Sequence, residues 1–183
     1  VLGSMAADDA ADLITELDQD RRAPILEMLP EPQRRKVRSL LSYHPETAGG
    51  LMSPDFVLIP ETATVSDALE AIRSSTAPRE ALGVVFVADA QGLPSGSVSA
   101  VRLIQAPPDA PLSAVATPGV AHVHPDWDLG AVVRKMSDFN LTVAPVLDHE
   151  HGSMMGVITV DDVLELLLPS GFRRDYGVTA AEE

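Results

Sequence analysis

An internal repeat constrains the fold of this chain more than any other sequence feature. Ser53-Pro54 opens one copy and Thr117-Pro118 opens the other. In both copies the predicted order is strand, helix, strand, strand, helix. A unit of about sixty residues is small for an independent hydrophobic core, so we expect the two copies to pack together through their sheets.

The predicted elements of the two copies match one by one. The first copy has apolar strands at residues 56–59, 83–89 and 96–99 and an amphipathic helix at 65–72. The second copy has strands at 120–123, 141–148 and 156–159 and a helix at 129–136. The last strand of each copy leads directly into a further helix.

Residues 156–168 carry the clearest local signal, a strand that runs straight into a helix. Val157 and Ile158 supply the β-branched content of the strand. Thr159 is a candidate N-cap, and Asp162, three residues later, is an acidic partner in the first turn. A hydroxyl and a carboxylate at such a junction suit a sugar-phosphate group or a metal ion. The alternative is that Thr159 and Asp162 only cap the helix.

The region before the repeat has a different character and is predicted to be helical. Apolar positions recur at helical spacing in residues 7–17, 21–29 and 32–41, with Pro30 ending the second helix. The first turns of the first helix carry Asp8, Asp9 and Asp12, where carboxylates complement the helix dipole. Residues 45–52 form one more turn, in which two glycines permit a sharp change of direction.

Charge and composition exclude several classes of function. The 27 acidic residues outnumber the 13 basic ones and give a net charge of −14, which argues against a nucleic-acid or anionic-membrane surface. This charge is compatible with binding hard cations through oxygen ligands, or simply with an acidic soluble protein. The absence of cysteine excludes disulfides and thiolate chemistry. No stretch approaches the roughly 20 apolar residues that span a bilayer.

Nothing in the sequence indicates an enzyme. His122 and His124 alternate on one predicted strand, and His149 and His151 flank a predicted turn. Pairs of imidazoles without a third ligand are more typical of surface residues than of a zinc site. The chain has neither a dinucleotide-binding fingerprint nor a phosphate-binding loop.

Two stretches carry a family resemblance. The repeat, with residues 142–146 (TVAPV) before residues 156–163 (GVITVDDV), resembles a tandem CBS (cystathionine-β-synthase-type) pair, or Bateman module, over residues 51–168. Residues 43–54 (YHPETAGGLMSP) resemble the junction between the N domain and the CBS pair in MgtE-type magnesium transporters.

The resemblance implies an α+β fold with five segments. Residues 1–4 look like a cloning remnant, and residues 5–50 form a short α-helical subdomain like the C-terminal part of an MgtE N domain. Two β-α-β-β-α repeats follow at 51–116 and 117–168, and residues 169–183 form a C-terminal tail. The tail begins PSGFRR, which stops the helix and is more typical of soluble MgtE-related proteins.

The function implied is that of a regulatory, non-catalytic module of an MgtE-like magnesium transport system. Magnesium would bind between the helical subdomain and the CBS pair and change their packing, because a divalent cation relieves the repulsion of facing carboxylates. The implied location is cytoplasmic, or membrane-associated as the soluble region of a transporter. The implied metal ligands are Asp8, Asp9, Asp12, Asp161, Asp162 and Glu165.

The resemblance also implies a site for ATP or another adenine nucleotide in the CBS pair. Thr159 and Asp162 would hold the ribose. The adenine would lie along Thr142, Val143 and Pro145. In the first copy Arg102 replaces the aspartate and could contact phosphate.

The implied partners are a second copy, giving a homodimer through the CBS pair, and a magnesium-channel membrane domain in cis or in trans. No nucleic acid is expected. The alternative function is a soluble adenine-nucleotide sensor with no channel, which acts through a partner protein.

Overall fold

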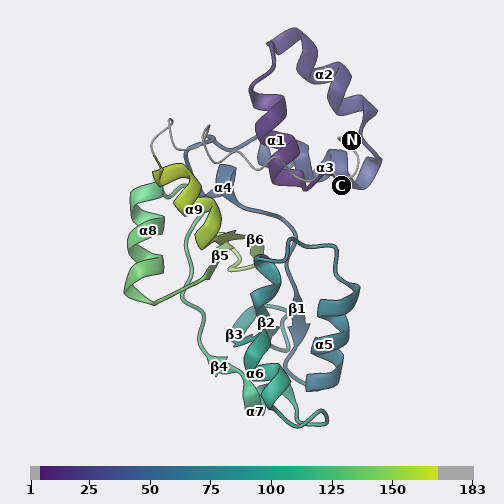
Figure 1. Ribbon diagram of the computed structural model, residues 1–183, viewed down its shortest axis with the longest axis vertical. Coiled ribbons are helices and arrows are strands. Elements are labelled where there is room, and N and C mark those ends of the chain that lie inside the picture. Colours follow the sequence, from purple (N-terminus) through teal and green to yellow (C-terminus); the bar gives the residue numbers. More distant parts are fainter. Residues whose placement is uncertain (1–4, 169–183) are drawn as a thin grey trace, which may run out of the picture.

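Three helices stand at one end of the molecule and two small sheets occupy the rest (Figure 1). The computed structural model describes residues 5–168, so the predicted cloning remnant and C-terminal tail lie outside the described residues. The three helices are α1 (Ala7–Thr15), α2 (Gln19–Met28) and α3 (Glu31–Leu40). Their ends lie within two residues of the predicted ones. Ile14 of α1 and Val37 and Leu40 of α3 are buried in one cluster, whereas α2 buries no residue.

The first repeat follows the predicted order around a mixed sheet. Strand β1 (Leu58–Pro60) runs parallel to β2 (Val84–Ala88), and β3 (Pro94–Ser99) runs antiparallel to β2. Helices α5 (Val65–Ser74) and α6 (Ala100–Gln105) pack against each other. A short 3-10 helix, η2 (Ala81–Gly83), precedes β2 and was not predicted.

The second repeat contains α8 (Leu129–Asp138), β5 (Val143–Leu147), β6 (Met154–Thr159) and α9 (Val160–Leu167). The prediction of a strand at 120–123 is wrong, because only Val123 pairs, in a parallel bridge to Val146. Proline explains the interruption. Val123 N donates to the Pro145 carbonyl, but Pro145 has no N–H with which to extend the ladder.

The two repeats exchange their opening segments. Ser53, which opens the first copy, pairs with Val157 of β6 in the second copy. Strand β4 (Thr117–Pro118), which opens the second copy, pairs with β3 in the first. Each opening segment follows a one-turn helix, α4 (Ala48–Leu51) or α7 (Leu112–Val115). Each sheet is therefore completed by residues from the other copy.

A glycine permits each of these crossings. A Cβ at Gly156 would lie 2.6 Å from the Ser53 carbonyl oxygen, and a Cβ at Gly96 would lie 2.7 Å from that of Thr117. Real Cβ atoms essentially never approach a backbone oxygen so closely, so only glycine fits at these two equivalent positions. The predicted strands begin with glycine for this reason.

The hydrophobic core joins the N-terminal helical segment (residues 5–50) to the second repeat. Ile14 and Val37 belong to the same buried cluster as Ala144 and Ile158, with Met52 and Ala48 also in it. The first repeat has a separate cluster, and Val143, Phe86 and Val157 pack between the two repeats. The mixed helix and strand content confirms the predicted α+β class. Within residues 5–168, no helix is long and apolar enough to cross a bilayer.

Replacing Gly156 by alanine should destabilise the protein by about 1–3 kcal/mol, because the added methyl group forces the Ser53 backbone away from β6. Urea unfolding measures the change. Gly83→Ala is the matched control, since a methyl group added there would have no atom within 4 Å and the backbone needs no positive φ. Equal stability of the two variants would contradict this account of the crossing.

Candidate functional site

The predicted cap at the start of α9 is present and complete. Thr159 Oγ1 donates to Asp162 Oδ2 at 2.6 Å, and Thr159 N donates to the same oxygen at 3.1 Å. Asp162 N donates to Thr159 Oγ1 at 3.3 Å. Thr64 and Asp67 form the same capping box at the start of α5. Capping by Thr159 and Asp162 is therefore a structural role, whatever else they bind.

The other predicted nucleotide residues are divided between the two repeats. Thr142 accepts a hydrogen bond from Val160 N at 2.9 Å through its carbonyl, and Val143 is the register partner of Thr159. These residues of the second repeat thus lie together with Asp162. Val143 and Pro145 are buried, so a ligand here would meet the backbone and the exposed Thr142 side chain. Arg102 is exposed on α6 of the first repeat.

A cavity of about 460 Å³ separates α1 from α9, and we call it the acidic cavity. Seven of the residues that line it carry a carboxylate, and none of its described lining residues is basic. The carboxylates come from α1, from its C-terminal end, from the segment before α4 and from α9. They are Asp8, Asp9, Asp12, Glu16, Glu46, Asp162 and Glu165.

Burial and neighbouring negative charges both raise the pKa of a carboxyl group that lines this cavity, Asp12. Desolvation raises the pKa of Asp12 above its ordinary value, and the charges of Asp8, Asp9, Glu16 and Glu165 raise it further. Glu165 lies on α9 and lines the same cavity as Asp12 of α1, so carboxylates of the two helices face each other across it. Repulsion between α1 and α9 follows.

Asp8 is half-buried, and one of its carboxylate oxygens is enclosed. Desolvation raises its pKa, and the neighbouring charge of Asp9 adds to the effect. The Ser53 hydroxyl is close enough to lower that pKa in part, yet Asp8 Oδ1 and Ser53 Oγ are both buried without a hydrogen-bond partner of normal geometry. A buried anionic oxygen without a donor is stabilised by a cation or by a cation's water shell.

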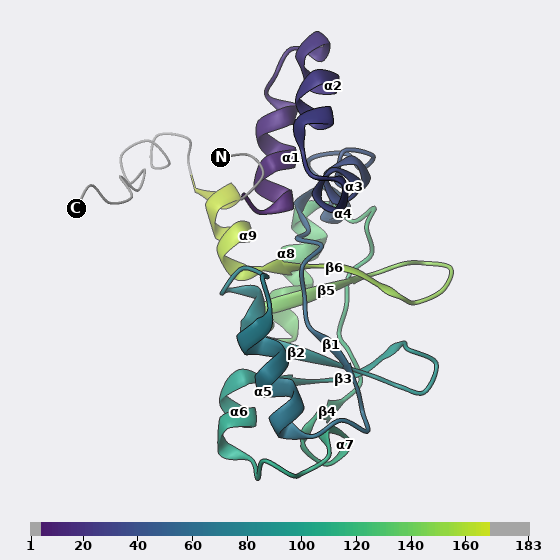
Figure 2. The same cartoon turned by 90° about the vertical axis from the view of Figure 1, so that its right-hand side faces the viewer.

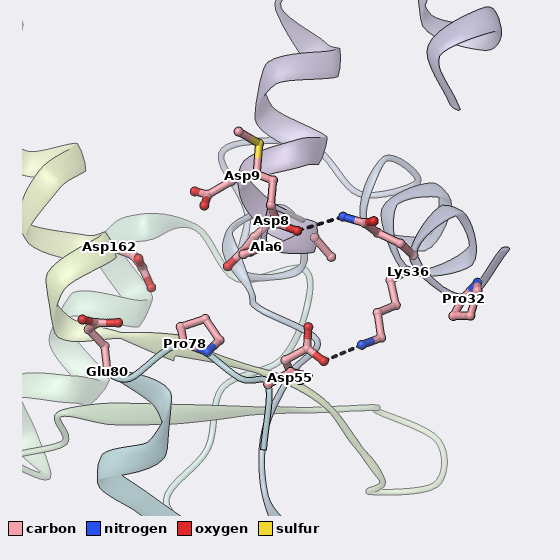
Figure 3. Close-up of a pocket in the computed structure, with 13 residues that line it drawn as sticks. Ala6, Asp8, Asp9, Pro32, Lys36, Asp55, Pro78, Glu80 and Asp162 are labelled. Carbon is pink, nitrogen blue, oxygen red and sulfur yellow. Dashed lines mark hydrogen bonds and ion pairs between the residues drawn. The ribbon is translucent and has the colours of Figure 1, made fainter. Parts of the chain in front are cut away.

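A second cavity of about 640 Å³ shares Asp8, Asp9 and Asp162 with the first, and we call it the lysine-side cavity. Its walls also include the N-terminal part of α3 and the loop before η2 in the first repeat. Figure 3 shows Lys36 of α3 reaching across it to Asp55, with which it forms an ion pair. In contrast to the acidic cavity, this one therefore contains a resident positive charge.

The structure places the predicted metal residues unequally. Five of the six line the acidic cavity, whereas Asp161 is exposed and lines neither cavity. Glu16 and Glu46 were not predicted, although Glu16 stands one helical turn after Asp12, a spacing that puts both on one face. Within residues 5–168, no group of three His, Asp or Glu side chains converges closely enough to hold a bare metal ion.

This donor set fits magnesium with its water shell. Carboxylate oxygens are hard ligands, and Mg²⁺ usually keeps several waters and contacts only one or two carboxylates directly. The acidic cavity, with a volume of about 460 Å³, has room for such waters. Asp8, Asp12 and Glu165 are the residues that would share the ion, directly or through water.

The histidines gather elsewhere. The rings of His124 and His149 stack at 4.0 Å, and His122 meets His124 edge-on at 5.1 Å. Asp126 Oδ1 lies 2.6 Å from His149 Nε2, a contact that lowers the pKa of Asp126. Stacked rings direct their nitrogens along their own planes and do not converge on one point. This arrangement fits packing at the surface.

Asp12→Asn should raise stability at pH 7 in the absence of divalent cations by about 0.5 kcal/mol, a Tm increase of about 1–2 °C. The folded pKa of Asp12 is raised above the ordinary 3.8, so the ionised group destabilises the fold at neutral pH. The gain should vanish as the pH falls through the raised folded value towards 3.8, where wild-type Asp12 becomes protonated.

The control variant, Asp67→Asn, should change stability at pH 7 in the opposite direction. Hydrogen bonds from Thr64 lower the pKa of Asp67, so Asp67→Asn should lose stability at pH 7 and approach wild type only as Asp67 protonates in acid. Melting curves between pH 4 and 7 in a chelator compare the two variants. A destabilised Asp12→Asn protein at pH 7 would contradict the electrostatic account.

Known protein families and relatives match most of this chain. The profile of the MgtE intracellular N domain matches residues 1–46, and the profile of the CBS domain matches residues 48–109 and 112–169. Magnesium transporter MgtE of Thermus thermophilus is 34% identical over 163 residues, which cover 87% of this chain and 36% of the relative. Magnesium transporter MgtE of Enterococcus faecalis is 29% identical over 132 residues, covering 72% of this chain and 29% of the relative. This chain thus spans about a third of the length of these relatives.

Solved structures agree with the sequence matches. The cytosolic domain of the Mg²⁺ channel MgtE in complex with ATP superimposes with a TM-score of 0.84 at 33% identity, over 90% of this chain and 67% of that one. The soluble part of a magnesium transporter superimposes with a TM-score of 0.82 at 28% identity, over 91% of this chain and 64% of that one. These matches confirm the resemblance that the sequence indicated. The chain belongs to the CBS-domain family, and its MgtE-type N domain followed by a CBS pair makes it a homologue of the cytosolic region of MgtE magnesium transporters.

Proposed function

We propose that this chain is the magnesium-sensing regulatory region of an MgtE-like magnesium transport system. The acidic cavity carries the proposal: carboxylates of α1 and α9 face each other there without a basic residue among its described lining. When the ion is absent, their repulsion opposes docking of the helical segment on the second repeat. When the ion binds, the same carboxylates hold the two together, and the packing of the domains changes.

The energetics favour such a switch. The helical segment and the second repeat share one buried apolar cluster, which favours docking at all magnesium concentrations. The acidic cavity opposes docking, so the balance between the two depends on the cation. Magnesium binding of moderate affinity can therefore shift the equilibrium between the docked and undocked states, because the two opposing contributions leave only a small difference in free energy.

Adenine-nucleotide binding is the second part of the proposal. The homologous cytosolic domain of 33% identity was solved in complex with ATP. In this chain Thr142, Val143, Pro145, Thr159 and Asp162 lie together in the second repeat and remain the residues we propose for the ribose and adenine. Arg102, on the corresponding helix of the first repeat, is proposed for the phosphates.

We also propose a homodimer through the CBS pair. Ile104 of α6 and Leu164 of α9 occupy equivalent helix positions in the two repeats, and they are 73% and 53% exposed. Both helices lie on the left side in the view of Figure 2. A second copy would cover both side chains in one two-fold contact, which fits the internal pseudo-symmetry.

The proposed partner in the membrane is a magnesium-channel domain, in cis or in trans, with this region on the cytoplasmic side. The role is regulatory and not catalytic. The alternative is an adenine-nucleotide sensor that acts through another protein, and the observation in its favour is the ATP complex of the homologue. One titration separates the two functions.

Magnesium should raise the Tm of the wild-type chain by a few degrees, about 5 °C at about 100 times its Kd. Asp12→Asn combined with Glu165→Gln should remove most of this increase, because it neutralises one carboxylate on each side of the acidic cavity. The matched control is Asp161→Asn combined with Asp20→Asn, which removes the same charge from exposed positions outside both cavities. The control should keep the magnesium response.

The same melts with ATP test the nucleotide function. ATP without magnesium should stabilise wild type, and Asp162→Ala should abolish that effect. Asp67→Ala removes the equivalent capping box of α5 and controls for the lost helix cap. A response to ATP together with no response to magnesium would favour the nucleotide sensor, and a response to neither ligand would exclude both functions.

Ile104→Lys combined with Leu164→Lys should convert the dimer to a monomer, because two charged side chains would be buried in the proposed contact. Sedimentation equilibrium measures the mass. Met28→Lys on α2, where the methionine is 82% exposed, is the control and should remain dimeric. A monomeric wild-type chain at micromolar concentration would contradict the proposal.

A further inference from the structure

The interface between the helical segment and the CBS pair has two unlike sides. On the α1 side, the acidic cavity has seven carboxylates and no base among its described lining residues. On the α3 side, Lys36 is the base that lines the lysine-side cavity and pairs with Asp55. Magnesium depletion therefore leaves the first side with no positive charge among its described lining residues. The second side keeps one, Lys36, although Asp8, Asp9, Glu80 and Asp162 also line it.

The Lys36–Asp55 pair connects parts of the chain that must move apart if the helical segment undocks. Lys36 belongs to α3, and Asp55 lies after Ser53, in the segment that enters the first repeat. The Lys36 side chain is 42% exposed and that of Asp55 is 23% exposed, so the pair is partly shielded from water. Figure 3 shows the two side chains spanning the space between α3 and that segment.

Other contacts at the α3–α4 end of the helical segment also need no ion. Ala48 N and Gly49 N of α4 donate to the carbonyls of Trp127 and Pro125, both at 2.8 Å. A Cβ at Gly49 would meet the Tyr43 ring at 2.6 Å, so the residues between α3 and α4 pack closely on this junction. The end of the helical segment near α3 and α4 is thus held by neutral hydrogen bonds and one ion pair, whereas α1 faces the carboxylates of α9.

We propose that Lys36 and Asp55 form an ion-independent clasp that keeps the α3 side of the helical segment on the CBS pair when magnesium is absent. Undocking then begins at α1, which swings away from α9 while α3 remains held. The second half of this proposal rests on the magnesium-sensing function proposed above. The clasp itself does not, because it acts in a magnesium-free protein.

Distances between labelled cysteines can test the clasp, since the chain has no cysteine of its own. Ser39→Cys with Ser66→Cys reports the α3 side, and Leu13→Cys with Ser137→Cys reports the α1 side; all four positions are exposed. Spin labels and pulsed dipolar spectroscopy give the distance distributions, with labelled protein diluted into unlabelled protein to suppress distances between copies.

In a chelator, wild type should keep on the α3 side the distance distribution of the docked state and lose it on the α1 side. Lys36→Met should lower the ratio of docked to undocked populations on the α3 side by about two- to fivefold, the range for a partly exposed ion pair. Arg35→Met removes the same charge from the neighbouring, more exposed position on α3 and should leave the ratio unchanged. The exchanged pair, Lys36→Asp with Asp55→Lys, should restore the wild-type ratio.

Two outcomes overturn the clasp: Lys36→Met behaving as Arg35→Met, or the exchanged pair failing to restore what Lys36→Met loses. Either result is obtained without magnesium, so it is distinct from a failure of magnesium sensing. That failure would be seen as distances on the α1 side that stay the same when magnesium is added to wild type.

Discussion

The arrangement of all three parts of the chain depends on one backbone crossing. Ser53 and Val157 exchange two hydrogen bonds of 2.8 Å each, and the bare backbone of Gly156 lets the strands come together. This contact ties the end of the helical segment to the second repeat just before the chain enters the first repeat. The position of α1 opposite α9, and so the acidic cavity, follows from where the crossing directs the helices.

Two contributions oppose each other at the interface between the helical segment and the second repeat. They depend differently on solution conditions. The apolar cluster shared by α1, α3 and the second repeat is insensitive to ions, whereas the carboxylate repulsion responds to charge, screening and pH. Among the described lining residues, a lysine lines one of the two cavities and not the other, which would make the response uneven across the interface. A uniform interface would dock or undock as a whole, whereas the clasp that we propose would give this one a defined place at which opening starts.

Local patterns in the sequence predicted most of the fold. The helix periods and the capping box of Thr159 and Asp162 are each encoded within a few residues, and the repeat is visible because the same local pattern occurs twice. The strand predicted at 120–123 was wrong because Pro145 lies on the other side of the pairing. The sequence could place Asp161 and Asp162 on α9 but could not tell which one faces α1, since that depends on how the helical segment docks. Glu46, Lys36 and Asp55 were missed for the same reason: their roles come from contacts between distant segments.

The exchange of opening segments also separates the order of synthesis from the order of assembly. Ser53 leaves the ribosome about a hundred residues before its partner Val157, an interval of about 5–20 s at ordinary translation rates. During that time α1, α2 and α3 have no second repeat on which to pack. The helical segment is therefore made before both repeats but cannot complete its packing until the second repeat has been made.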